Sequence, residues 1–163
     1  MVSILARLTD ILRLRSGPQD MPGGWSLTII LSLAYIAQGF WADRIYDAGD
    51  DAPRSLLAIT VQFLFIAALL NFKNLKSRLA QTLSTLASVG LVFGFISIFL
   101  IYQVDSEKNQ PVLALVWFAI FLWSLAVDAH IYRHALSITM SLGALVAVMI
   151  FAVNFILIEA VFG

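Results

Sequence analysis

The residues best suited to chemistry lie in one short segment, Val127-Asp128-Ala129-His130-Ile131-Tyr132-Arg133-His134. Ionisable side chains in or beside an apolar segment are costly, and they are often functional. His130 and His134 are four residues apart, so they share one helix face and could ligate a metal. A complete set of ligands would need a partner chain, because no second carboxylate-rich segment accompanies them.

The alternative interpretation, which we favour, gives this segment no metal. Asp128 would pair with a nearby basic residue, and both histidines would lie among lipid headgroups. The basic residues available for this pairing are Lys73, Lys76, Arg78 and Arg133.

Three further polar side chains, Gln38, Gln62 and Asn154, interrupt apolar runs. Side chains of this type form hydrogen bonds to neighbouring helices instead of facing lipid, and Gln62 is nearest the middle of its run. Together with Asp128 they could line the path of a small transporter or channel that acts as an oligomer. A proton or ion pathway usually has several ionisable groups at the midplane, whereas the charged residues here lie toward the ends of the runs.

Known catalytic and cofactor-binding patterns are missing from the sequence. There is no cysteine, no G-x-x-x-x-G-K-[ST], no H-E-x-x-H and no G-x-S-x-G. The net charge is zero, so no overall field favours nucleic acid. We therefore predict no catalytic, cofactor or metal site.

The composition indicates what kind of element must position these residues. Of 163 residues, 61% are hydrophobic and only 12% are charged, and the apolar residues fall in long uninterrupted runs. A soluble globule of this size needs a larger polar surface. The sequence therefore predicts an all-α, polytopic membrane protein in contact with the lipid bilayer.

Five spans are predicted, over residues 25–41, 55–72, 79–102, 111–132 and 135–161. The last two could form one run of about 50 residues, but such a helix would be roughly 75 Å long, over twice the thickness of the hydrocarbon region. We expect the break at Asp128 to His134, and four spans would result if one half did not insert. The loop Ala42 to Arg54 is expected to be a solvated acidic turn that holds Asp43, Asp47, Asp50 and Asp51.

Residues 1–16 are predicted to form an amphipathic helix in the membrane interface, because they are too short and too charged to cross it. Anionic lipid headgroups are expected to contact two groups of basic residues. These are Arg7, Arg13 and Arg15 in the N-terminal helix, and Lys73, Lys76 and Arg78 in the turn after the second span.

The distribution of lysine and arginine predicts the orientation. A cytoplasmic N-terminus places seven of the ten basic residues inside and leaves Arg44, Arg54 and Lys108 outside. The C-terminus is then periplasmic, if the membrane is a bacterial inner membrane.

Pairs of small residues predict close helix packing. Gly90 and Gly94 form a GxxxG pattern, and Gly143 with Ala147 forms a related pair. Packing within the chain and self-association explain these pairs about equally well.

The layout of an N-terminal amphipathic segment and five closely connected spans resembles the membrane domain of the Yip family. The segments 12–22 and 122–130 are similar to those of small inner-membrane proteins of Gram-negative bacteria. The resemblance implies a non-enzymatic membrane organiser and transfers no site. Our leading hypothesis from the sequence is an accessory or scaffolding subunit of an inner-membrane assembly, with other membrane proteins as partners; a transporter or channel, or a lipid-binding protein, are the alternatives.

Overall fold

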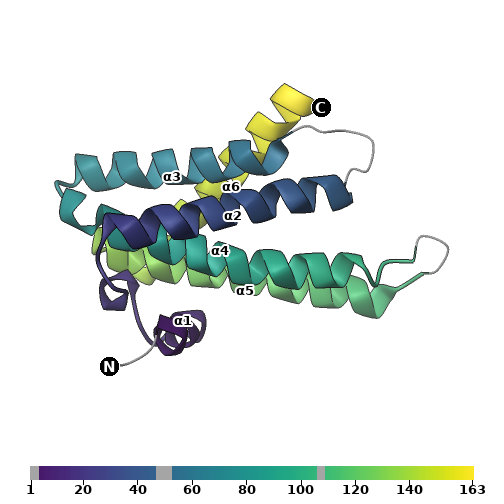
Figure 1. The fold of residues 1–163 in the computed structure, drawn as a ribbon, viewed down its shortest axis with the longest axis horizontal. Coiled ribbons are helices and arrows are strands. Elements are labelled where there is room, and N and C mark those ends of the chain that lie inside the picture. The colour runs from purple at the N-terminus through teal and green to yellow at the C-terminus, as the bar shows by residue number, and fades with distance from the viewer. Residues whose placement is uncertain (1–3, 47–52, 106–108) are drawn as a thin grey trace.

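The computed structural model describes residues 4–46, 53–105 and 109–163, and all regular structure in these ranges is helical (Figure 1). Some residues of the predicted acidic turn, Asp47, Asp50 and Asp51, lie outside the described residues, as does Lys108. The helices are α1 (Ile4–Leu12), α2 (Trp25–Tyr46), α3 (Arg54–Phe72), α4 (Leu79–Ile101), α5 (Pro111–Leu136) and α6 (Met140–Phe162). Two short 3-10 turns, η1 (Pro18–Asp20) and η2 (Lys76–Arg78), precede α2 and α4.

Helices α2 to α6 are each long and apolar enough to cross a membrane. The shortest, α3, has 19 residues and spans about 28 Å, close to the thickness of the hydrocarbon region. The described residues therefore confirm the all-α fold and the five predicted spans. Pro111 begins α5, where its missing N–H costs no helical hydrogen bond.

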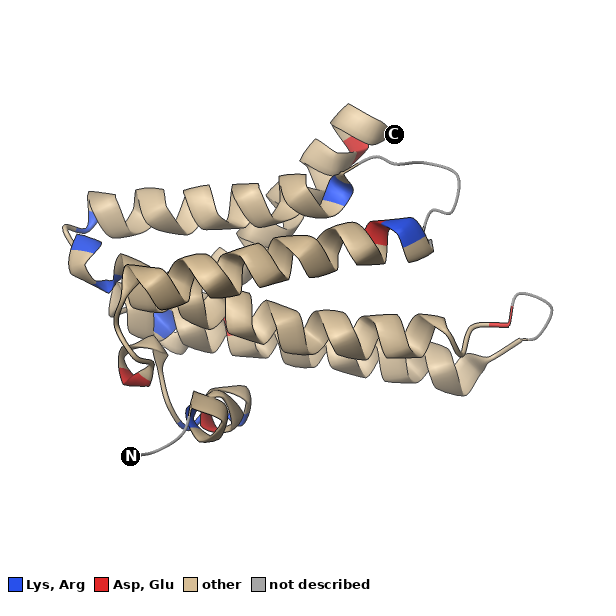
Figure 2. Cartoon of the chain, in the orientation of Figure 1, with Lys and Arg blue, Asp and Glu red and all other residues tan. Residues whose placement is uncertain are grey.

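The five long helices run back and forth, so their connections gather at two ends of the bundle (Figure 1). One end, which we call the basic end, holds the N-terminal segment and the α3–α4 and α5–α6 turns (Figure 2). The opposite end holds the C-terminal ends of α2, α4 and α6 and the N-terminal ends of α3 and α5 (Figure 1). The tightest apolar core lies toward the basic end, where Ile66, Leu70, Leu86, Val127 and Tyr132 are almost completely buried.

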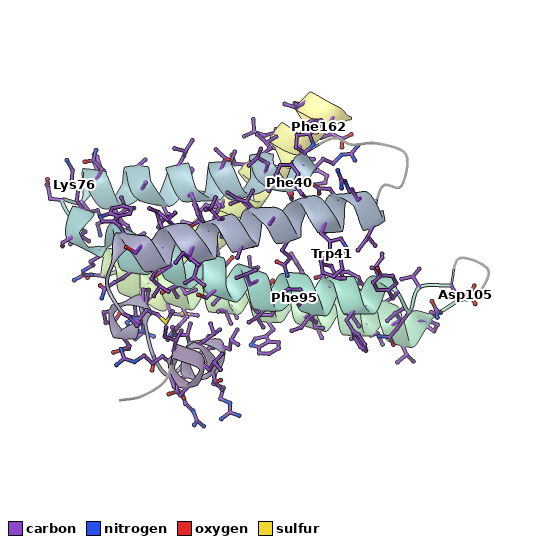
Figure 3. All side chains as sticks on the ribbon, viewed as in Figure 1. Phe40, Trp41, Lys76, Phe95, Asp105 and Phe162 are labelled. Atoms are coloured by element: carbon purple, nitrogen blue, oxygen red, sulfur yellow. The ribbon has the colours of Figure 1, made fainter. Side chains whose placement is uncertain are left out.

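Helix α2 packs mainly against α4, and α5 packs mainly against α6. Near the basic end α6 lies close to α5, but at the opposite end it leans toward α3 (Figure 1). There the guanidinium carbon of Arg54 lies 5.8 Å from the ring centroid of Phe162. Trp41 of α2 and Phe95 of α4 are exposed and contact each other edge to face, with ring centroids 6.3 Å apart (Figure 3).

The predicted small-residue pairs contact neighbouring helices of the same chain. A Cβ atom at Gly90 would overlap the ring of Tyr35, and one at Gly94 would overlap the side chain of Gln38. A Cβ atom at Gly143 would overlap the carbonyl oxygen of Ala129. These glycines therefore permit the close packing of α2 on α4 and of α5 on α6, while self-association through them stays a prediction.

The predicted break at Asp128 to His134 is wrong, because α5 continues through this segment to Leu136. The chain turns instead at Ser137, which has φ 52° and ψ 54° in the left-handed region. Thr139 then caps α6, and its hydroxyl accepts a hydrogen bond from the Leu142 N–H at 3.4 Å. Most of the polar side chains between Asp128 and His134 are buried or half-buried against other parts of the protein, so they do not require the helix to end there.

Two other boundaries also differ from the prediction. Helix α2 extends beyond Trp41 to Tyr46, so Asp43 lies in a helix and not in a solvated turn. Its carboxylate accepts hydrogen bonds from the Ser55 N–H at 3.0 Å and from the Ser55 hydroxyl at 2.6 Å, so it caps the first turn of α3. Helix α1 ends at Leu12, and its Ile11 is fully buried against the bundle.

Candidate functional site

Asp128 lies in the interior of α5, eight residues or about 12 Å before the end of the helix at Leu136. This depth places the carboxylate inside the membrane-spanning segment. A charged carboxylate near the centre of a span costs about 2.5–3.5 kcal/mol on insertion scales. The side chain is half-buried and faces a space between the helices.

That space consists of two adjoining cavities, each of about 350 Å³, which we call the central chamber. The cavities share five lining residues from three helices: Tyr35 of α2, Ala58 and Gln62 of α3, and Ser124 and Asp128 of α5. Tyr35 and Gln62 lie near the middle of their helices. The chamber therefore occupies the middle of the bundle.

The divergence of α6 from α5 makes room for the second cavity. Gly143 and Ala147 are buried near the basic end, where the two helices are close. Farther along, Phe151, Asn154 and Phe155 of α6 and Phe121 of α5 line the cavity. The first cavity extends toward the opposite end of the bundle, where Ala42, Ser55 and Ser97 line it.

The chamber is closed on the side of the basic end by packed side chains. Tyr132, one turn after Asp128, is fully buried, and its hydroxyl accepts a hydrogen bond from Gln62 Nε2 at 2.9 Å. Ile66 and Leu70, which follow Gln62 along α3 toward the basic end, are also fully buried. The chamber thus extends toward one end of the bundle only.

Two hydrogen-bond acceptors at the chamber have no partner in the described part of the chain. Among the described residues, no hydrogen bond or ion pair involves the carboxylate of Asp128. Asn154 donates from Nδ2 to the Ile150 carbonyl oxygen at 3.1 Å, but its buried Oδ1 accepts no hydrogen bond. Buried polar atoms are nearly always paired, so the unpaired Oδ1 of Asn154 is an exception. The carboxylate of Asp128 is only half-buried and faces the chamber, so a group that supplies donors can reach it there.

The predicted polar residues are thus brought together in part. Asp128, Gln62 and Asn154 line the chamber, as does Gln38, but Gln38 Nε2 is used in a 2.9 Å hydrogen bond to the Leu91 carbonyl oxygen. Gln38 therefore joins α2 to α4, and its side chain also fills the space beside Gly94.

His130 and His134 lie apart from the chamber. Positions 128 and 130 differ by about 200° around a helix, so His130 is on the other side of α5. Its Nε2 is 3.1 Å from the Ser16 carbonyl oxygen of the N-terminal segment, and its ring centroid is 4.5 Å from that of His134. In the described part of the chain, no group of three His, Cys, Asp or Glu side chains could hold a metal.

The predicted pairing of Asp128 with a basic residue is wrong. Lys73 Nζ donates to the Leu136 carbonyl oxygen at 3.0 Å, and Arg78 Nη1 donates to the carbonyl oxygens of His134 and Ala135, both at 3.1 Å. These cations stabilise the C-terminal end of α5, where carbonyl groups lack helical partners and the helix dipole is negative.

Lipid contacts of the basic residues stay a prediction. Arg13, Arg15, Lys76 and Arg133 are exposed, and Arg7 is half-buried. Figure 3 shows Lys76 at the α3–α4 turn, at the edge of the bundle.

Tyr35 and Tyr132 belong to the site but were not singled out from the sequence. Tyr35 lines both cavities together with Asp128, and Tyr132 lies one helical turn after Asp128 and accepts the hydrogen bond from Gln62. Tyr35 stands in a run that also holds Ser32 and Gln38, and Tyr132 stands between His130 and Arg133, so neither hydroxyl group is a distinctive signal. A tyrosine near the centre of a span, rather than in an interfacial belt, is the feature that could have identified Tyr35.

Comparison with family models, with curated proteins and with solved structures finds no match to this chain.

Proposed function

We propose that this protein is a small membrane transporter whose solute binds in the central chamber at Asp128. The observation that carries the proposal is the carboxylate of Asp128, which lies inside a span, faces a chamber formed by several helices and has no partner among the described residues. Uncompensated ionisable groups at this depth are typical of solute and ion pathways.

The geometry favours this proposal over a scaffolding subunit. A scaffold needs only a surface on which other proteins pack. The hydrogen bonds of Gln62 and Gln38 would join the helices of a scaffold equally well, and an unpaired carboxylate would add nothing to that role. The chamber is also complete within one chain, so solute binding does not require the oligomer that the sequence suggested. Solute sites near the bilayer midplane, between helices, are the usual arrangement in secondary transporters.

Charge supports an orientation for this transporter in a bacterial inner membrane. The basic end carries Lys73, Lys76, Arg78, Arg133 and the three arginines of the N-terminal segment (Figure 2). A cytoplasmic basic end agrees with the excess of lysine and arginine in cytoplasmic loops. The central chamber would then extend toward the periplasm. In this orientation, a reporter enzyme that works only in the periplasm should be active when it is fused after Gly163. A reporter enzyme that works only in the cytoplasm should be inactive at the same position.

Flux through proteoliposomes tests the proposal. The purified chain is reconstituted, and uptake of protons, alkali cations, protonated amines, amino acids and sugars is measured for the wild type, Asp128→Asn and Glu159→Gln. Glu159 is the matched control, because it is an exposed carboxylate on α6 that does not line the chamber.

We expect at least one solute to be taken up by the wild type and by Glu159→Gln, with uptake at least about tenfold slower in Asp128→Asn. Loss of a hydrogen bond to a charged group costs about 1.5–3 kcal/mol, which corresponds to roughly 10- to 150-fold. Flux no greater than in protein-free liposomes for the whole set, or flux unchanged by Asp128→Asn, would overturn the proposal.

A further inference from the structure

We infer that the solute of the central chamber is a monovalent organic cation, a protonated amine with a small apolar body. This inference rests on the proposed role of the chamber as a solute site, and it names the class of solute. Three properties of the chamber lead to it: its charge, its unpaired hydrogen-bond acceptors and its apolar walls.

The charge of the lining selects a monocation. Among the described residues that line the two cavities, Asp128 is the one carboxylate, and none is a lysine, arginine or histidine. An anion would meet a second negative charge with no cation to offset it. A single positive charge would neutralise the carboxylate, and desolvated charges in the membrane interior are stable only when they are paired.

The hydrogen-bonding groups select a solute that donates. The carboxylate of Asp128 and Oδ1 of Asn154 can only act as hydrogen-bond acceptors, and neither receives a hydrogen bond from a described residue. An ammonium group brings both the positive charge and the N–H donors that these atoms lack.

The chamber is a poor site for a bare metal ion. Divalent hard cations need about six oxygen ligands, and the described residues hold no cluster of three metal-ligating side chains. A proton would neutralise Asp128, but it would leave two cavities of about 350 Å³ without an occupant. Cavities of this size are in the range of sites for small organic molecules.

Aromatic walls select the body of the solute. Phe121, Phe151 and Phe155 line the second cavity, and the ring centroids of Phe121 and Phe151 are 5.1 Å apart. Tyr35 lines both cavities, and Phe93 lines the first. Ring faces attract cations and pack against apolar groups. Because Phe151 and Phe155 are also partly exposed on the bundle surface, this wall borders the lipid.

Binding to the purified full chain in mild detergent tests the inference. The probes are benzylammonium, its neutral counterpart benzyl alcohol, its anionic counterpart benzoate, and sodium ion. Binding is measured by isothermal titration calorimetry and by the shift in apparent Tm, for the wild type, Asp128→Asn and Glu159→Gln. The asparagine has nearly the shape of the aspartate, and its Tm and elution volume without ligand show whether it folds.

Benzylammonium should bind the wild type and Glu159→Gln and raise the Tm by about 5 °C at roughly 100-fold excess over Kd. Asp128→Asn should weaken this binding by at least about tenfold, whereas benzyl alcohol, benzoate and sodium should give no shift that depends on Asp128. Equal binding of benzyl alcohol and benzylammonium, or benzylammonium binding unchanged by Asp128→Asn, would overturn the inference.

The two proposals can fail separately. Asp128-dependent flux of protons, a metal ion or another solute, without binding of benzylammonium, would retain the transporter and overturn the amine. Asp128-dependent binding of benzylammonium without flux of any solute would retain the amine site and overturn the transporter.

Discussion

Replacing Gly143 by alanine should push α6 away from α5 and destabilise the bundle. The added Cβ atom would overlap the Ala129 carbonyl oxygen and would lie 3.2 Å from the backbone nitrogen and from the Cβ atom of Arg133. The overlapping group belongs to a helix backbone, so no change of rotamer can relieve the contact. The helices must separate, and a gap of about 0.5–1 Å already removes a quarter to a half of the dispersion energy between the atoms it separates.

The expected loss of stability follows from two opposing effects. Overpacking typically costs about 1–3 kcal/mol, and alanine regains up to about 1 kcal/mol because it favours the helix more than glycine does. The net destabilisation should be about 1–2 kcal/mol. For a chain of this length it should lower the Tm by roughly 2–8 °C.

Thermal unfolding in mild detergent, followed by the fluorescence of the four tryptophans at one fixed scan rate, measures this change. Gly23→Ala is the matched control, since its added Cβ would lie 3.5 Å from the Gln81 side chain, an ordinary contact. The control should change the Tm by less than about 1 °C. A Gly143→Ala variant as stable as the wild type would refute the packing argument.

Three further substitutions test other parts of the structure through the same Tm measurement. Arg78→Ala removes the donors to the last carbonyls of α5 and should cost about 1–2 kcal/mol, while Lys76→Gln, an exposed neighbour, should cost little; equal effects would contradict this. Asp43→Ala removes the cap on Ser55 and should cost about 1 kcal/mol, and an unchanged Tm would rule out that cap. Asn154→Leu removes an unpaired buried oxygen, so the Tm should stay level or rise while the shift caused by benzylammonium disappears, and a lower Tm would show that Oδ1 has a partner.

The sequence predicted the helices well because their signals are long. Runs of apolar residues averaged over some twenty positions identify a span whatever its neighbours are, and all five spans are present. The prediction of the α5–α6 boundary is wrong because a cluster of polar residues does not by itself end a helix. In the structure the turn is made by Ser137 in the left-handed region and by the cap from Thr139, two local signals that are weaker than a cluster of charges.

Only part of the site could be predicted from the sequence, because the rest depends on how the helices pack. Asp128 stands out because aspartate is rare inside a span, but its surroundings depend on which helices meet it. Asn154 comes near Asp128 because α6 diverges from α5 toward α3, and Tyr35 and Gln62 come near it through the packing of α2 and α3, so no single segment encodes the site. The predicted ion pair of Asp128 does not form, because Lys73 and Arg78 donate hydrogen bonds to carbonyl oxygens at the C-terminal end of α5.

The docking of the N-terminal segment on α5 has a consequence for biogenesis. The Leu12 carbonyl oxygen accepts a hydrogen bond from Trp123 Nε1 at 3.0 Å, and the Ser16 carbonyl oxygen lies 3.1 Å from His130 Nε2; these partners are 111 and 114 residues apart along the chain. At about 5–20 residues per second, translation reaches His130 roughly 6–23 s after Ser16. Four spans have been synthesised by the time the segment can take its final place. The contacts of the N-terminal segment with α5 therefore form only after these helices have reached the insertion machinery. Its contacts with α4, among them the 3.1 Å hydrogen bond from Gln81 Nε2 to the Met21 carbonyl oxygen, can form earlier.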